Sequence, residues 1–142
     1  MTTRAQMSAS AKNAEGHTDL MCAALEGRTE AVKALLRRGV AVNAKDNEGR
    51  TALMFAVINL HKDAMRALLE HGVEVNARAN DGATALMLAV CTGDIGIVQA
   101  LLDKGADVKT EFTLTGKTAL MLATEKGYAN IAQLLKEAGA KK

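Results

Sequence analysis

The chain has 142 residues, the length of one ordinary domain, and 49% of them are hydrophobic against 24% charged. It contains two Phe, one Tyr and no Trp, so its core must be built from aliphatic side chains. The net charge of +2 is too small for a protein that tracks phosphates through its bulk charge. No secretion signal and no run of about 18 apolar residues occurs. We therefore expect a cytoplasmic protein with reduced cysteines and with neither nucleic acid nor membrane as a partner.

Residues 1–12 are small and polar without periodicity, and we expect them to form a flexible leader. After them a Thr-(Ala/Asp)-Leu-Met motif recurs with spacings of 33, 33 and 34 residues, beginning at Thr18, Thr51, Thr84 and Thr118. A set of glycines has the same spacings, at Gly39, Gly72, Gly105 and Gly139. A fixed period of this length predicts a solenoid built from repeats. The four repeats are 13–45, 46–78, 79–111 and 112–142.

Each repeat is expected to open with a Gly-Xaa-Thr turn and a short first helix. The glycine suits a positive φ, and the threonine hydroxyl suits an N-cap. These first helices are expected at residues 19–26, 52–59, 85–92 and 119–126. A glycine directly follows three of them, but the second repeat has Leu60 at that position. Leu60 is strained if the backbone there requires a positive φ.

A second helix, apolar on one face, is expected in every repeat. These helices are expected at residues 29–38, 62–71, 95–104 and 129–138. The recurring glycines just past their ends suit left-handed caps. Short extended segments are expected next, at 40–43, 73–76 and 106–109. The one-residue excess in the third spacing lies within 112–115 and predicts a distorted loop tip there.

The repeats resemble those of the ankyrin-repeat family. Its Asp-x-x-Gly-x-Thr-Pro-Leu-His-x-Ala pattern is similar to DNEGRTALMFA from Asp46 and to ANDGATALMLA from Ala79. The Gly-Ala-Asp at 105–107 and the Val-Asn-Ala at 42–44 and 75–77 also match the family. The resemblance implies an all-α fold, an ankyrin-repeat solenoid of stacked helix-turn-helix units with short β-hairpin loops. It covers residues 13–142 as one repeat domain.

The sequence departs from the family pattern at three kinds of position. Asp or Ala replaces the proline, and Met replaces the histidine. Because flexible thioethers take the place of a hydrogen-bonding ring, we expect looser packing between repeats. Lys136 stands where the other repeats have leucine, which is what an end cap requires.

No group of residues in the sequence supports catalysis, a cofactor or a metal. A column of methionines could bind Cu(I), but its apolar neighbours predict a buried core column, made of Met21, Met54, Met87 and Met121. Cys22 falls in an interior column. Cys91 falls in a column that faces the family's groove, but no His with Asp or Asn is in register to activate it as a nucleophile. The histidines fall in different columns and are expected at the surface, as is the basic run on the second helix of the first repeat.

In the ankyrin-repeat family, variable positions at the loop tips and along the first helix bind protein partners, and the resemblance implies this role for the matching positions here. The tip positions are Lys45, Asn47, Glu48, Arg50, Arg78, Asn80, Asp81, Ala83, Glu111 and Lys117. The helix positions are Leu25, Glu26, Ile58, Asn59, Cys91, Thr92, Glu125 and Lys126. Three of them, Leu25, Ile58 and Cys91, would stand side by side as an apolar centre, with Arg50, Arg78 and Lys117 as a charged rim. The alternative is that these three pack between adjacent first helices and are covered.

We therefore expect a non-enzymatic protein–protein interaction module, a scaffold that binds another protein through its concave face and is a monomer when alone. The alternative is a structural or assembly component. Such a component would self-associate, or dock into a larger complex, through its outer helices or an imperfectly capped end.

Overall fold

A computed structural model describes residues 12–14 and 16–139, so residues 1–11 of the expected leader lie outside the described residues. The chain forms two compact units, Met1–Glu74 and Val75–Lys142. The first unit contains α2 (Asp19–Glu26), α3 (Thr29–Arg37), α4 (Ala52–Ile58) and α5 (Lys62–His71). The second contains α6 (Ala85–Thr92), α7 (Ile95–Asp103), α8 (Ala119–Glu125) and α9 (Ala129–Glu137). Each unit therefore consists of two helix-turn-helix repeats, and every expected helix is found with its ends within one residue.

The first helices begin where they do because each has the same N-cap. In all four, a threonine hydroxyl accepts a hydrogen bond from the backbone N–H of the methionine three residues later, at 3.2–3.4 Å. This bond satisfies one of the free N–H groups at the start of a helix. In α2 the Met21 sulfur also accepts a bond from the Thr18 N–H, at 3.4 Å. The thioether thus completes a capping box, which a glutamate usually does.

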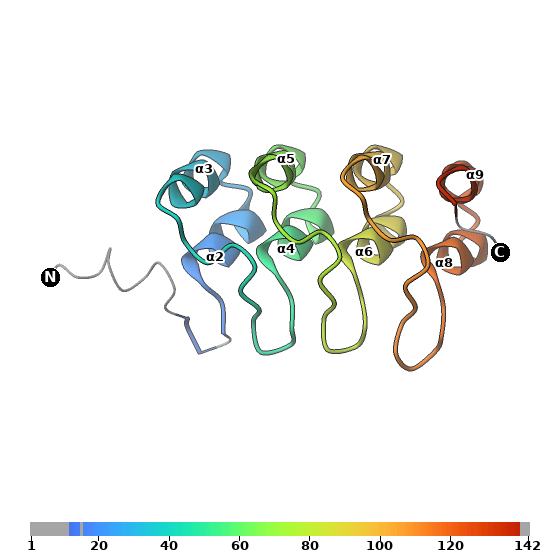
Figure 1. Cartoon of the computed structure of the whole chain (residues 1–142), viewed down its shortest axis with the longest axis horizontal. Coiled ribbons are helices and arrows are strands. Elements are labelled where there is room, and N and C mark those ends of the chain that lie inside the picture. The colour runs from blue at the N-terminus through green and yellow to red at the C-terminus, as the bar shows by residue number, and fades with distance from the viewer. Residues whose placement is uncertain (1–11, 15, 140–142) are drawn as a thin grey trace, which may run out of the picture. The chain divides into compact units, whose positions relative to one another are not determined.

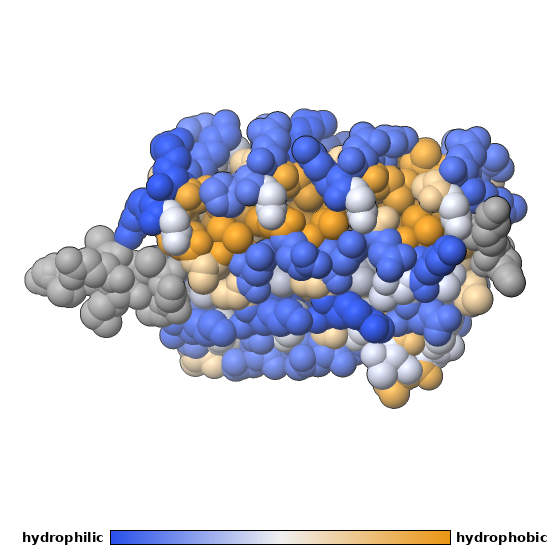
Figure 2. All heavy atoms as spheres, in the orientation of Figure 1, coloured by the Kyte–Doolittle hydropathy of each residue, from blue (hydrophilic) through white to orange (hydrophobic). Residues whose placement is uncertain are grey.

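Within each unit the two repeats stack side by side. In the first unit α2 packs on α4 and α3 on α5, and in the second α6 packs on α8 and α7 on α9 (Figure 1). The leucine of the recurring motif is buried in every repeat, at 1–4% exposure, as Leu20, Leu53, Leu86 and Leu120. Because each helix covers its apolar face with a neighbour, the aliphatic core follows directly from stacking. In Figure 2 the outer surface of α3 and α5 is hydrophilic, and the exposed basic residues of α3 belong to it.

The loops that precede the first helices contain no β-strand in the part of the chain that the structure describes. Each is instead closed by backbone bonds within the loop. In one loop they run from Asp46 N–H to the Arg50 carbonyl and from Gly49 N–H back to the Asp46 carbonyl, and in another from Ala79 N–H to Ala83 and from Gly82 N–H back to Ala79. In the last loop the bond runs from Phe112 N–H to the carbonyl of Lys117, one residue further along the chain. An isolated antiparallel bridge pairs its neighbours. The extra residue therefore lengthens this tip, which is the tip where the sequence predicts a distortion.

Two of the sequence-based expectations about the helices and the segments between them need correction. The segments after the second helices are not simply extended, because turns occur at 42–43, 75–76 and 108–109. The methionine column is buried in three repeats, at 1% exposure each, but Met121 is 42% exposed. No first helix follows α8 among the described residues, so nothing there covers Met121.

Leu60 has φ of 61°, and it is the one described residue other than glycine with a positive φ. The corresponding Gly27, Gly93 and Gly127 have φ of 73–80°. The predicted strain is therefore present, in a side chain that is 48% exposed.

Candidate protein-binding surface

The surface predicted to bind a partner begins at the end of α4 in the first unit. Residues 52–57 of this helix are buried, whereas Ile58 is 39% exposed and Leu60 is 48% exposed. Asn59 between them is exposed, and Leu25 at the matching position of α2 is half-buried. Two large apolar side chains therefore reach solvent where the buried face of α4 ends.

Polar contacts with the end of α2 hold the end of α4 in place. The carbonyl oxygen of Leu25 accepts a hydrogen bond from Asn59 Nδ2 at 3.1 Å, and His61 Nε2 lies 3.1 Å from the same oxygen. The His61 ring lies so close to Gly27 that a Cβ there would be 2.5 Å from Nδ1. The expectation of a surface histidine is therefore wrong for His61, which is half-buried because it joins two repeats.

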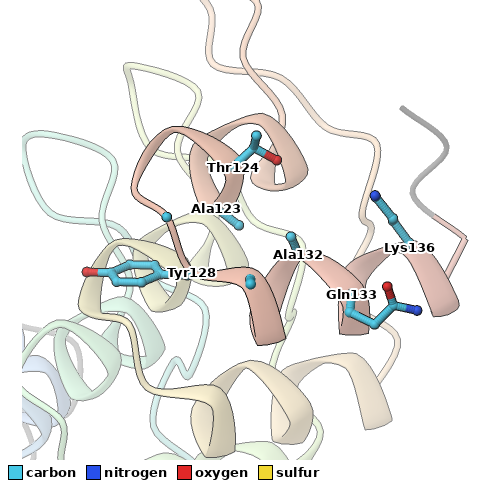
Figure 3. Close-up of a pocket in the computed structure, with 8 residues that line it drawn as sticks. Ala123, Thr124, Tyr128, Ala132, Gln133 and Lys136 are labelled. Atoms are coloured by element: carbon cyan, nitrogen blue, oxygen red, sulfur yellow. The ribbon is translucent and has the colours of Figure 1, made fainter.

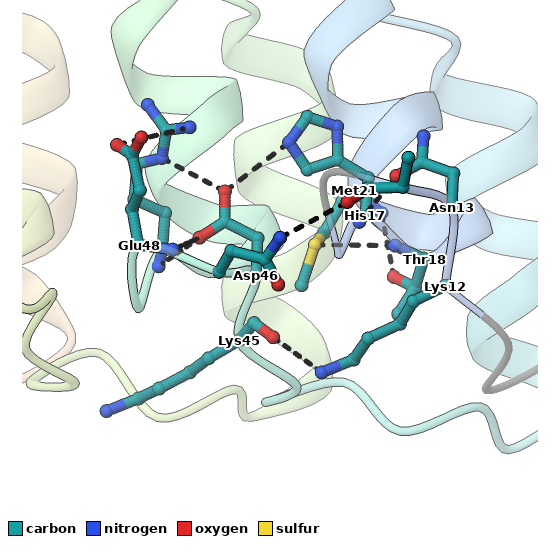
Figure 4. A network of polar contacts seen from close by, with 11 residues as sticks. Lys12, Asn13, His17, Thr18, Met21, Lys45, Asp46 and Glu48 are labelled. Atoms are coloured by element: carbon teal, nitrogen blue, oxygen red, sulfur yellow. Dashed lines mark hydrogen bonds and ion pairs between the residues drawn. The ribbon is translucent and has the colours of Figure 1, made fainter.

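Below the helices, the loop tip of the first unit is organised around the buried carboxylate of Asp46 (Figure 4). Its Oδ1 accepts bonds from the backbone N–H groups of Glu48 and Arg50, at 2.9 and 2.8 Å, and its Oδ2 accepts one from Arg50 Nε at 3.1 Å. Burial by itself would raise the pKa of this carboxyl. The two backbone bonds and the Arg50 guanidinium outweigh burial, and the pKa lies below its ordinary value.

His17 joins the same cluster from the preceding repeat. Its Nε2 lies 3.3 Å from Asp46 Oδ2, and its side chain is only 14% exposed. The imidazole meets the Phe55 ring edge-on, with 5.0 Å between centroids, and the Arg50 guanidinium lies 5.0 Å from the same centroid. The expectation of a surface histidine is thus wrong here too. The repeat spacing only shows that His17 is equivalent to Arg50. It does not predict that the His17 side chain contacts Asp46 of the next repeat.

The other predicted tip residues of the first unit lie at the surface. Lys45 and Glu48 are exposed, and Arg50 Nη2 lies 3.6 Å from Glu48 Oε1. The carbonyl of Lys45 accepts a bond from Lys12 Nζ at 2.7 Å. The tip therefore presents one acidic side chain, Glu48, and two basic ones, Lys45 and Arg50. Arg50 is already bonded to other residues of the loop.

In the second unit the predicted tip residues belong to two neighbouring loops that are bonded together. Arg78 donates from Nε to the Gly82 carbonyl at 3.3 Å, and from Nη2 to the carbonyl of Glu111. The Asp81 carbonyl accepts a bond from Thr113 N–H at 3.1 Å. The side chains of Arg78, Asn80, Asp81 and Glu111 are exposed. Ala83 was also expected at the surface but is 3% exposed, because it closes its loop over the core.

The helix positions of the second unit differ in how accessible they are. Cys91 is a free, exposed thiol at the end of α6. The neighbouring Thr92 is half-buried, and its hydroxyl donates to the Ala89 carbonyl at 2.6 Å and accepts from Asp94 N–H at 3.2 Å. Lys117 Nζ lies 2.9 Å from Glu125 Oε2. Thr92 and Lys117 therefore already have partners within the unit.

Across residues 12–14 and 16–139, no three His, Cys, Asp or Glu side chains come together in a way that could hold a metal ion. None of the helices in this described part is long and apolar enough to span a membrane.

The fold and this surface define a class of protein: an all-α repeat protein with stacked helical pairs, polar loop tips and apolar side chains exposed at the end of a first helix. The family described as "Ankyrin repeats (3 copies)" matches residues 4–79 and again residues 77–142. The chain belongs to the ankyrin-repeat family. Its repeats are generally protein–protein interaction modules, and the family is typically non-enzymatic. No curated protein matches the chain.

Proposed function

We propose that this chain is a non-enzymatic interaction module that binds a protein partner on the face made by its loop tips and the ends of its first helices. The single observation that supports this most is the exposure of Ile58. It is 39% exposed directly after six buried residues of α4. An apolar side chain at the edge of a rigid helix can enter a partner's pocket with little loss of entropy.

Exposed polar side chains on the loop tips of each unit suit the edge of an interface. Lys45 and Glu48 in the first unit and Asn80, Asp81 and Glu111 in the second are exposed polar residues on loops. Charges at an interface edge contribute mainly to association rate and specificity. The contacts of Arg50 and Arg78 within their own units hold these loops in place before binding, which reduces the ordering cost.

The test compares Ile58→Arg with the parent in affinity capture from a lysate of the source organism, followed by binding assays with the purified captured protein. Ile58→Arg should abolish capture while the melting temperature stays within a few degrees of the parent's, because surface substitutions change stability little. Ile95→Arg is the matched control, since Ile95 is 44% exposed at the start of a second helix. If Ile58→Arg combined with Arg50→Glu still captures the partner, this surface is not the binding face.

A further inference from the structure

The loop tip of the first unit buries a charge that the loop itself does not require. Asp46 is the one charged residue that is buried in the described part of the chain. The loop of the third repeat makes the same two backbone bonds with Ala79 and Ala83 at the positions of Asp46 and Arg50. Because alanines close an equivalent loop, the buried carboxylate and its guanidinium partner are not needed for closure, and burying a charge is costly.

The second unit keeps its charges out of the interior. None of its described charged side chains is buried. The hollow between α8 and α9 is lined mostly by small and polar side chains, and Figure 3 shows Ala123 and Ala132 at its centre. Among the described residues that line it, only Lys136 is charged, and this lysine is exposed at one end of the hollow. A buried carboxylate is therefore a particular feature of the tip that carries Arg50.

His17 completes this cluster from the preceding repeat (Figure 4). Its Nε2 lies 3.3 Å from Asp46 Oδ2, the same oxygen that accepts the bond from Arg50 Nε at 3.1 Å. An ionised carboxylate only accepts hydrogen bonds, so the histidine nitrogen that faces it carries a hydrogen. His17 and Arg50 also both lie against the Phe55 ring. They therefore share two neighbours, and the Asp46 side chain is only 1% exposed.

We propose that His17 is a positioning residue for Arg50. It holds and covers the Asp46 carboxylate, and the carboxylate in turn fixes the direction of the guanidinium. Water that reached Asp46 Oδ2 would compete with Arg50 Nε for that oxygen, whereas a bond in a dry site is stronger. The Arg50 side chain is 34% exposed, and its Nη2 lies 3.6 Å from Glu48 Oε1, beyond hydrogen-bonding distance. Its terminal N–H groups are therefore presented to solvent in one plane.

This inference deepens the proposed function and rests on it, because a fixed guanidinium matters to a partner only if Arg50 lies on the binding face. A planar guanidinium held in one direction suits an acceptor oxygen on the partner. Less ordering entropy is lost on binding when the side chain is already held in place. His17 then contributes to binding through Asp46 and Arg50.

The experiment measures the exchange of the Arg50 Nε–H with water, by NMR on the full chain near neutral pH and without a partner. In the parent this hydrogen should exchange at least about tenfold more slowly than that of Arg37, an exposed arginine of α3. His17→Ala should remove most of this protection. The loop should still form in this variant, because the third repeat has alanine at the same position. His17→Gln can place an amide N–H at Asp46 Oδ2 and should restore most of the protection.

Val32→Ala is the control for stability, because Val32 is fully buried in α3 of the same unit and does not belong to the loop. It should lower the melting temperature and leave the Arg50 Nε–H protected. Equal loss in Val32→Ala and His17→Ala would make the effect one of global stability and overturn the proposal.

Three other results would also overturn it. They are an Arg50 Nε–H that exchanges as fast in the parent as that of Arg37, protection that survives His17→Ala, and a His17→Gln variant no better protected than His17→Ala. Because these measurements use no partner, they stand whatever the capture experiment gives. The effect of Ile58→Arg on capture tests the proposed function separately.

Discussion

Met21 and Met121 occupy the same position in the first and the last repeat, yet Met21 is 1% exposed and Met121 is 42% exposed. The same substitution should therefore have different costs at the two sites. Met21→Ala leaves a cavity in the core and should lower the free energy of unfolding by about 2 to 5 kcal/mol. Met121→Ala should cost less than about 1 kcal/mol. Urea denaturation measures both, and equal losses would show that α8 is covered in solution.

We expect Leu60 to destabilise the fold, because it has φ of 61° at a position where the other three repeats have glycine. Leu60→Gly should raise the free energy of unfolding by about 1 kcal/mol, the low end of the cost of such a conformation. Thermal melting should show a higher midpoint. Gly27→Ala is the opposite control, since its Cβ would lie 2.5 Å from the His61 ring, and it should lower the midpoint. A lower midpoint for Leu60→Gly would contradict the assigned backbone conformation.

Asp46 should make the stability of the first unit depend on acid pH. Its folded pKa lies below the unfolded value of 3.8, so its stabilising contribution is fully present above about pH 4. That contribution is lost as the pH falls through the folded pKa. Asp46→Asn should cost about 1 to 3 kcal/mol at pH 7 and weaken the loss of stability below pH 4. Denaturation of parent and variant across pH 2 to 7 tests this, and parallel curves would refute it.

The Thr51 hydroxyl accepts the Met54 N–H at 3.4 Å and caps the most buried of the first helices. Thr51→Ala should destabilise the protein by about 1 kcal/mol, the usual cost of losing an N-cap. Thr51→Ser keeps the hydroxyl and should recover most of that loss. Chemical denaturation of the two variants separates the stabilisation by the N-cap hydrogen bond from the stabilisation by packing of the threonine methyl group. If serine is no better than alanine, packing of the methyl group is the larger effect.

Much of the fold could be predicted from the sequence because its signals are local. A threonine that caps a helix, a glycine that permits a positive φ and an apolar stripe of helical period each act within a few residues. The strain at Leu60 was predictable in the same way, from its alignment with three glycines. The longer tip before α8 was predictable from a single extra residue in the spacing.

The candidate surface was less predictable, because exposure depends on neighbours from other repeats. Ile58 and Cys91 are exposed as expected, whereas Leu25 is half-buried and Thr92 uses its hydroxyl within its own helix end. His17 and His61 looked like surface residues but contact Asp46 and the Leu25 carbonyl in adjacent repeats. No pattern along the chain distinguishes a histidine in solvent from one that fills the space between two loops.

The sequence by itself determined the repeat, its four helical pairs and the residues that begin and end each helix, since these depend on short-range hydrogen bonds and backbone preferences. Only the tertiary structure decided which of the equivalent side chains are covered. Met121 is a methionine at the same helix position as three buried methionines. It differs in that no first helix of a further repeat packs against it in the described part of the chain. Whether a side chain is buried depends on the neighbouring repeat that packs against it, and the sequence of a single repeat does not contain that information.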